Sequence, residues 1–252
     1  MAVIDELIDY GMKLDTGLRV QDVRIGLGYT AVQIEGGEVG LAYTFRGEAG
    51  HTCTAVKMAG ELAGKPVGHL LAFMKEGDVV SAAVGLATFN ALLQRRLPTP
   101  EGEDFFPIIQ LQAGETVGMV GFFGPVIPLI RKARCELRIF EKNLARGEGL
   151  FSPEKIPQKL PECSVVILSA TTLINRTFEE VVAYTREARH VVLLGPSTPL
   201  VPEVMGRYGV TLLAGMKIVR PAAVLRIVSE GGGTQRLRGT VEKMVVSCKK
   251  AG

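Results

Sequence analysis

The second half of the chain contains a series of short apolar runs rich in β-branched residues, and helical segments separate most of them. The runs are residues 117–121, 136–140, 165–169, 191–195 and 210–215. The helical segments are residues 125–134, 177–188 and 199–208, with a shorter one at 153–159. Strands that are apolar along their whole length are buried on both faces, so this alternation predicts a mostly parallel, doubly wound sheet. A last strand near 241–246 gives five or six strands.

The first hundred residues follow a different pattern. An amphipathic helix at 1–14 precedes two β-type runs, 29–34 and 39–45, and the Gly36–Gly37 pair between them favours a hairpin. Helical segments follow at 54–63, 67–75 and 79–94, the last with Asp78 as its N-cap. Residues 97–104 are polar and contain two prolines. We therefore expect an α/β chain with a small α+β domain at 1–104 and a doubly wound, mostly parallel domain at 105–252.

Composition excludes several classes of protein. Lys and Arg number 29 and Asp and Glu 26, so the net charge of +3 is too small for a nucleic-acid or membrane-surface binder. The four cysteines are far apart and form no CxxC pair, which favours reduced thiols in a cytoplasmic protein. We expect no membrane span and no signal peptide. The sequence leaves a homodimer open.

The first candidate for ligand binding is the turn after the first strand of the second half, TVGMVGFFGP at 116–125. A strand–turn–helix of this kind directs backbone N–H groups toward a ligand. Met119 replaces the first glycine of a dinucleotide fingerprint, and Gly121 and Gly124 remain. Glu141 follows twenty residues after Gly121, where such folds keep an acid for ribose hydroxyls. A simple packing turn and a surface ion pair of Glu141 are the alternatives.

The next strand ends in SATTLINRT, residues 169–177. Thr177 and Glu180 have the spacing of a capping box at the start of a helix. Thr171, Thr172 and Asn175 are then free to contact a ligand, or to make the ordinary hydrogen bonds of a turn.

A third turn, LLGPSTP at 193–199, places Thr198 as an N-cap and Pro199 as the first helical residue. Gly195, Pro196 and Ser197 would then face outward. In the usual doubly wound order this strand lies beside the first one, so the turns at 121–124 and 195–198 would flank one ligand crevice.

Two features of the first half could also bind a ligand. Asn90 lies on the small-residue face of its helix, where its amide contacts either a ligand or a neighbouring loop. His51 and Cys53 form an H-x-C pair that could share a metal ion. The other histidines, His69 and His190, belong to no second cluster, so we expect no dedicated metal site.

Several of these segments together resemble a two-domain prokaryotic family of unknown function labelled "putative heavy-metal chelation". The resembling segments are GLATFNALL, VGMVGFFGP, IFEKN, TTLINRT and LLGPSTPLVPE. The resemblance implies an enolase-N-terminal-like domain followed by a Rossmann-like domain, with one site where the two meet. The site positions that it carries over are Thr88, Asn90, Gly121, Phe122, Phe123, Gly124, Glu141, Thr171, Thr172, Asn175, Gly195, Pro196, Ser197 and Thr198.

The same resemblance implies an enzyme that makes, condenses or hydrolyses a pterin-, flavin- or siderophore-like chelator in the interdomain cleft. In that hypothesis Glu141 and Asn175 are catalytic, and Phe122 and Phe123 form an apolar wall. The ligand would be nucleoside- or pterin-like. Two alternatives stay open: a non-catalytic carrier of a metal–chelator complex, and an enzyme that uses S-adenosylmethionine or a nucleotide at the same turn. Thiolate and imidazole ligands are scarce, so a bare metal held by side chains is not expected.

Overall fold

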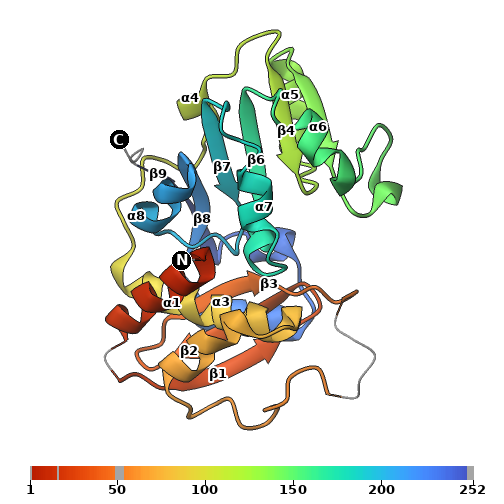
Figure 1. The fold of residues 1–252 in the computed structure, drawn as a ribbon. Coiled ribbons are helices and arrows are strands. Elements are labelled where there is room, and N and C mark those ends of the chain that lie inside the picture. The colour runs from red at the N-terminus through yellow and green to blue at the C-terminus, as the bar shows by residue number, and fades with distance from the viewer. Residues whose placement is uncertain (1, 16, 49–53, 249–252) are drawn as a thin grey trace.

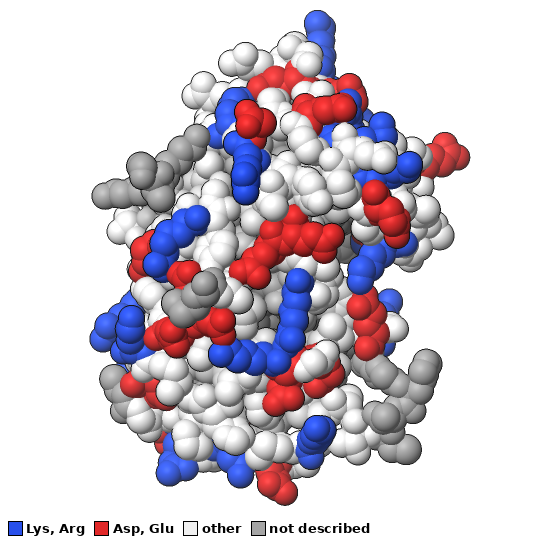
Figure 2. Space-filling model, in the orientation of Figure 1, with Lys and Arg blue, Asp and Glu red and all other residues white. Residues whose placement is uncertain are grey.

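The computed structural model describes residues 2–15, 17–48 and 54–248 of the 252-residue chain. It contains a three-stranded and a six-stranded sheet, which Figure 1 shows in the lower and upper parts of the molecule. None of the helices in the described ranges is long and apolar enough to cross a membrane. On the face seen in Figure 2, basic and acidic side chains are interspersed.

The small sheet is antiparallel and consists of β1 (Val20–Ile25), β2 (Tyr29–Ile34) and β3 (Val39–Tyr43), after helix α1 (Val3–Leu14). Gly36 and Gly37 have φ of 108° and 94°, which gives the hairpin predicted at this pair its tight turn. Helix α3 (Val79–Leu93) covers one face and is buried at every position after Val79. Asp78 caps it as predicted, because its carboxylate accepts the N–H groups of Val80 and Ser81.

The helix predicted at 54–63 is not formed, because residues 54–66 make a series of turns. Gly60, within the predicted segment, has a φ of 90°, which does not occur in a regular right-handed helix. Helix α2 (Val67–Leu71) and the 3-10 helix η1 (Ala72–Lys75) follow, in the place of the helix predicted at 67–75.

A helix from the second half covers the other face of the small sheet. Tyr29, Ala31, Val39 and Leu41 pack against Val224, Leu225, Val228 and Leu237. The first three of these partners lie on α9 (Pro221–Ser229), and Leu237 lies on η7 (Thr234–Leu237). The packed unit around the small sheet therefore includes residues far beyond 104.

The large sheet has the order β5-β4-β6-β7-β8-β9, parallel except for β9. Its strands are β4 (Thr116–Val120), β5 (Glu136–Phe140), β6 (Val165–Ser169), β7 (His190–Leu194), β8 (Leu212–Ile218) and β9 (Val241–Ser247). The α-helices of this half before α9 are α4 (Phe106–Ile109), α5 (Ile127–Lys132), α6 (Ile156–Lys159), α7 (Phe178–Val182) and α8 (Pro202–Met205). The remaining 3-10 helices are η2 (Gln94–Arg96), η3 (Leu144–Arg146), η4 (Pro153–Lys155), η5 (Ala170–Leu173) and η6 (Gly206–Tyr208).

Helices cover both faces of this sheet, as expected for a doubly wound fold. Along β6, Val165 and Ile167 share a buried cluster with Ile109 of α4 and Ile130 of α5. The alternate residues Val166 and Leu168 belong to a second cluster with Ile156, Val181 and Val204, from α6, α7 and α8. The core of the second half therefore lies on both sides of the central strands.

The expected neighbour of β4 is wrong. The sequence argument placed the strand now called β7 beside β4, whereas β6 pairs with β4 and β7 lies beyond β6. After β5 the chain crosses back over β4, then continues outward in one direction, which is the other common doubly wound order. The order reverses between β4 and β6, so the turns at 121–124 and 195–198 do not flank one crevice.

Candidate functional site

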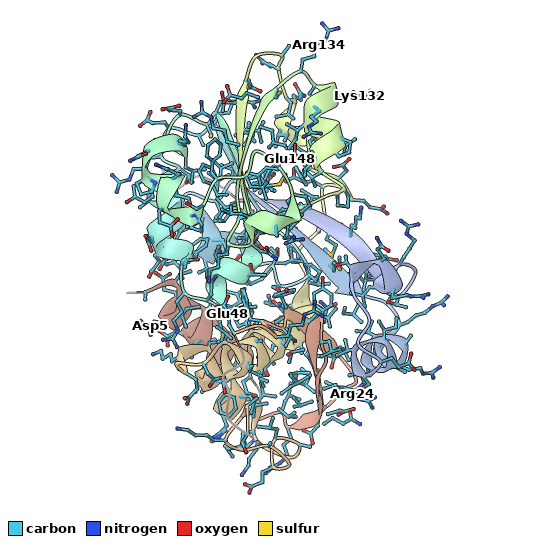
Figure 3. All side chains as sticks on the ribbon, turned by 90° about the vertical axis from the view of Figure 1, so that its right-hand side faces the viewer. Asp5, Arg24, Glu48, Lys132, Arg134 and Glu148 are labelled. Atoms are coloured by element: carbon cyan, nitrogen blue, oxygen red, sulfur yellow. The ribbon has the colours of Figure 1, made fainter. Side chains whose placement is uncertain are left out.

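The carboxyl ends of the parallel strands face the small sheet. Figure 1 shows β6 and β7 pointing toward the part that contains β1–β3. Tyr43, at the end of β3, donates its main-chain N–H to Ser197 Oγ across 2.8 Å. Lys142 Nζ lies 3.2 Å from Glu48 Oε1, and Figure 3 shows Glu48 where the two parts meet, far from Lys132 and Arg134. The polar turns predicted to bind a ligand therefore lie between the two sheets.

Residues 43–48 form a strap across this edge of the large sheet. One end is bound to Ser197, which follows β7, and the other to Lys142, which follows β5. These two strands are three positions apart, a span of about 14 Å. Within the strap, the N–H of Glu48 is bound to the carbonyl of Phe45, so its second half forms a turn. The strap thus connects the loops that follow β7 and β5, and β6 and β4 lie between these two strands.

Gly121 brings the turn after β4 against β6 at this point. Its φ is 94°, and a Cβ added there would lie 3.0 Å from Cβ of Ser169. Both the backbone and the neighbouring strand therefore require glycine. Gly124 does not have a positive φ, and an added Cβ would make only an ordinary contact, 3.6 Å from the ring of Phe122.

Beside this turn, Phe122, Arg146 and Glu141 form one contact group. The Arg146 guanidinium carbon lies 4.7 Å from the centroid of the Phe122 ring. Its Nη1 is 3.1 Å from Glu141 Oε2, and the Glu141 side chain is only 12% exposed. Glu141 Oε1 accepts the N–H of Asn143 at 3.1 Å. Glu141 thus makes an ion pair within its own loop, and the guanidinium of that pair lies over the Phe122 ring in the turn after β4.

The turn after β6 supplies hydroxyl groups. Ser169 Oγ and Thr171 Oγ1 are hydrogen-bonded at 2.8 Å, next to Gly121. Thr172 Oγ1 donates to the carbonyl of Ser169 at 2.7 Å, so the turn itself uses this hydroxyl. Sequence reasoning missed Ser169, although its place as the last residue of a buried strand was a signal for it.

The capping box expected at Thr177 is wrong. Helix α7 has no side-chain cap at Thr177, whose hydroxyl instead donates to Asn175 Oδ1 at 2.8 Å. The main-chain N–H of Thr177 donates to the same oxygen at 3.3 Å. The side-chain oxygen of Asn175, predicted to be catalytic, therefore serves the turn.

The turn after β7 holds the two parts together. Asn90 Nδ2 donates to the carbonyls of Leu41 and Ser197, at 2.9 and 3.2 Å. The N-cap expected at Thr198 is wrong, because α8 begins at Pro202. Thr198 is buried, and its hydroxyl donates to the carbonyl of Ala214 in β8. The hydroxyl of Thr198 thus points into the sheet and caps no helix.

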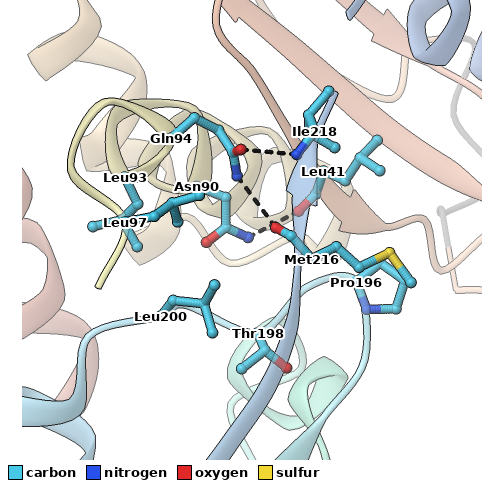
Figure 4. Close-up of a pocket in the computed structure, with 10 residues that line it drawn as sticks. All are labelled: Leu41, Asn90, Leu93, Gln94, Leu97, Pro196, Thr198, Leu200, Met216 and Ile218. Atoms are coloured by element: carbon cyan, nitrogen blue, oxygen red, sulfur yellow. Dashed lines mark hydrogen bonds between the residues drawn. The ribbon is translucent and has the colours of Figure 1, made fainter. Parts of the chain in front are cut away.

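Asn90 and Thr198 line a small cavity, shown in Figure 4 with Gln94 bound to Met216 and Ile218. Its volume is about 10 Å³, close to that of one water molecule. Asn90 Oδ1 is buried there without a hydrogen-bond partner. Thr88 lies deeper, and its hydroxyl donates to the carbonyl of Val84 within α3. This region has no space for a heterocycle.

A larger cavity of about 310 Å³ lies where the start of α1 meets the end of η1 and the 172–179 segment. Its lining is Ala2, Val3, Ile4, Asp5, Lys75, Thr172, Leu173, Arg176, Phe178 and Glu179. The Lys75 and Asp5 side chains form an ion pair, and Glu179 accepts the N–H of Val3. Of the predicted site residues, only Thr172 reaches this cavity.

The residues that the structure describes do not fit a protein-held metal ion. His51 and Cys53 lie outside the described residues, and within the described ranges no group of three or more His, Cys, Asp and Glu could hold a metal. Burial raises the pKa of Cys163 to about 11 and that of Cys248 to about 12. Both thiols are protonated near neutral pH, and a metal requires the thiolate.

Two family profiles match the sequence, and both are described as "Putative heavy-metal chelation". DUF4213 matches residues 4–93, and DUF364 matches residues 104–247, more than half of the chain. The chain belongs to the DUF364 family. The resemblance stated from the sequence motifs is thereby confirmed.

Solved structures of DUF364 proteins share the fold. One from Pyrococcus horikoshii is 22% identical, with a TM-score of 0.87 over 98% of this chain and 100% of that one. Another, from Desulfitobacterium hafniense, is 23% identical, with a TM-score of 0.82 over 97% and 98% of the two chains. Both are described as proteins of unknown function. At these identities the likeness shows the α/β fold alone.

A curated relative is an uncharacterized protein of Methanocaldococcus jannaschii. It is 25% identical over 170 residues, which cover 66% of this chain and 66% of that protein. The matched region is thus slightly less than two thirds of the relative. The DUF364 profile is described only as "Putative heavy-metal chelation", and the descriptions of the relative and of the two solved structures name no reaction and no ligand.

Proposed function

We propose that this protein binds a chelator-like small molecule of the pterin, flavin or siderophore kind at the switch point below the strap, and acts on it as an enzyme. The observation that carries the proposal is the stack of the Arg146 guanidinium on Phe122, with the same guanidinium paired to Glu141. A flat, polar group of the protein itself, the Arg146 guanidinium, thus contacts both an aromatic ring and a carboxylate. The family description agrees with a ligand that itself chelates the metal.

The neighbouring side chains have suitable roles toward such a ligand. Phe122 provides an apolar face for a ring, and the Ser169–Thr171 hydroxyl pair provides donors and acceptors at the other side of Gly121. Glu141 is the carboxylate paired with the guanidinium that lies over the ring, so it is our candidate for the general acid or base. The strap would keep water from a ligand held there, which strengthens polar contacts.

Binding is tested by thermal unfolding with pterin, lumichrome and 2,3-dihydroxybenzoate, each alone and as its iron complex. A ligand at 100 times its Kd adds about 2.7 kcal/mol to the free energy of unfolding. We expect at least one of these ligands to stabilise the wild-type protein and to lose its effect in Phe122→Ala. The control is Phe106→Ala in α4, outside the proposed site. The proposal fails if no ligand stabilises the protein, or if Phe122→Ala responds as the wild type does.

Catalysis needs its own measurement. The bound ligand is incubated with stoichiometric protein and analysed by mass spectrometry, in the presence and absence of S-adenosylmethionine. An enzyme converts the ligand, and Glu141→Gln slows the conversion while the ligand still binds. Complete recovery of the unchanged ligand would contradict the enzymatic part and favour a carrier.

A further inference from the structure

The Arg146 guanidinium makes two contacts that a flat ligand could make in its place. Its carbon lies 4.7 Å from the centroid of the Phe122 ring, and its Nη1 lies 3.1 Å from Glu141 Oε2. Glu141 and Arg146 lie in the loop after β5, and Phe122 lies in the turn after β4. A planar cation thus lies over the ring and donates one N–H, from Nη1, to one oxygen of the carboxylate.

We infer that Phe122 and Glu141 form a recognition subsite for a planar heterocycle with a guanidine-like edge, and that Arg146 is the intramolecular stand-in for that edge. This inference rests on the proposed function and narrows its ligand class. A guanidine-like edge has a ring N–H beside an exocyclic amino group, so both groups donate to one carboxylate. Pterins and guanine have this edge.

The other proposed ligand classes lack it. The corresponding edge of a flavin ring has an N–H between two carbonyl oxygens, and catechol-type chelators present anionic oxygens. A carboxylate repels each of these oxygens, and burying the unmatched groups adds a further penalty. Glu141 therefore selects the amino-substituted ring from among the proposed ligands.

The subsite keeps its shape when Arg146 leaves. Glu141 Oε1 is bound to the N–H of Asn143, and the Glu141 main chain is bound to Phe151 at 2.9 Å. The Arg146 side chain, in contrast, is 47% exposed. Exposed ion pairs and exposed cation–π contacts each contribute at most about 1 kcal/mol. A ligand can therefore displace Arg146 at small cost while the carboxylate stays oriented.

Two ligands that differ in a single group test the inference by calorimetric titration. Pterin has a 2-amino group where lumazine, with the same bicyclic ring, has a 2-oxo group. We expect wild-type protein to bind pterin about tenfold more tightly or better, the effect of an unmatched polar group. Glu141→Gln should remove most of this preference, because the amide offers one donor and one acceptor.

If Arg146 occupies the place of the ligand, its removal should increase the affinity of the protein for pterin. Arg146→Ala removes the internal competitor, so pterin should bind about two- to fivefold more tightly, as expected for an exposed contact. Lys132→Ala, at the far end of the large sheet (Figure 3), should leave the affinity unchanged. Guanosine is titrated in parallel, and tighter binding of guanosine than of pterin would assign the subsite to a purine nucleoside.

The inference and the proposed function fail in different ways. Equal affinities for pterin and lumazine, with both lost in Phe122→Ala, would overturn the guanidine-like edge while the ring site remains. Unchanged or weaker pterin binding in Arg146→Ala would overturn the stand-in role. If neither pteridine nor any of the other ligands binds, the proposed function itself is wrong.

Discussion

The main-chain N–H of Tyr43 donates a hydrogen bond of 2.8 Å to Ser197 Oγ, and this contact joins the end of β3 to the turn after β7. Asn90 in α3 donates to the carbonyl of the same serine. The turn that was expected to contact a ligand thus holds the two parts of the molecule together. Because β6 separates β7 from β4, the ligand site that we propose lies at the turn after β4 and does not include the turn after β7.

Asn90 should be important for stability rather than for ligand contact. Asn90→Leu removes the hydrogen bonds to Leu41 and Ser197 at a buried position. We expect the free energy of unfolding, measured in urea, to fall by about 1–3 kcal/mol. The control is Thr88→Val in the same helix, which removes only a bond to Val84 and should cost less. Equal stability of Asn90→Leu and wild type would show that these bonds do not stabilise the junction.

Gly121 and Gly124 form a matched pair of substitutions in one turn. Gly121→Ala forces a side chain into a positive φ and to 3.0 Å from Ser169, so we expect a loss of about 1–3 kcal/mol. Gly124→Ala has space and an ordinary φ, so its effect should stay within about 1 kcal/mol. Chemical denaturation of the two variants measures the difference. A larger loss for Gly124→Ala would contradict the geometry of the turn.

The stability of the protein at acid pH should depend on an ion pair at the amino-terminal ends of the parallel strands, just before β4 and β7. Arg189 donates to both carboxylate oxygens of Glu115, at 2.7 and 2.8 Å, and these bonds lower the pKa of Glu115 from about 4.5. Since the folded pKa is the lower one, the stabilisation is complete above pH 4.5 and is lost as the pH falls through the folded value. Solvent screening limits it to about 1 kcal/mol.

Unfolding curves of wild type and Glu115→Gln at several pH values measure the contribution of the Glu115–Arg189 pair to the free energy of unfolding. We expect the variant to be less stable at pH 7 and the difference to shrink toward pH 3. A difference that is constant between pH 7 and pH 3 would contradict the assigned role of the Glu115 carboxylate.

The metal content of the purified protein is a separate prediction. The thiols of Cys163 and Cys248 are protonated at neutral pH, and His and Cys are few in the sequence. We expect elemental analysis to find no stoichiometric zinc, copper or nickel. About one metal ion per chain, lost in Cys53→Ala, would show a protein-held site at His51 and Cys53.

The sequence predicted the strands of the large sheet well, because each is encoded locally. The apolar run at 165–169, for example, becomes β6 without a change of boundaries. The order of the strands in the sheet, in contrast, is not encoded locally. The sequence of the run at 190–194 does not indicate whether the chain crosses back over β4 before or after this strand. The location of the switch point depends on that crossover and could not be read from periodicity.

The expected caps at Thr177 and Thr198 show a second limit. Both threonines have the right sequence context for a helix start, and both use their hydroxyls elsewhere, with Asn175 and with Ala214. Asn175 lies in the same turn as Thr177 and Ala214 lies in the neighbouring strand β8, and each of these partners outcompetes a capping signal of about 1 kcal/mol. The pairing of Arg146 with Phe122 and Glu141 likewise joins two loops, so the sequence pointed to Glu141 and Phe122 without showing what connects them.

A crystal structure of the protein with its tightest-binding heterocycle tests the central claim most directly. We predict that the ring lies on Phe122 in place of the Arg146 guanidinium, with its polar edge within hydrogen-bond distance of Glu141 and with the strap above it. A ring bound instead in the cavity of about 310 Å³ between Lys75 and Thr172, with Arg146 still on Phe122, would contradict the account.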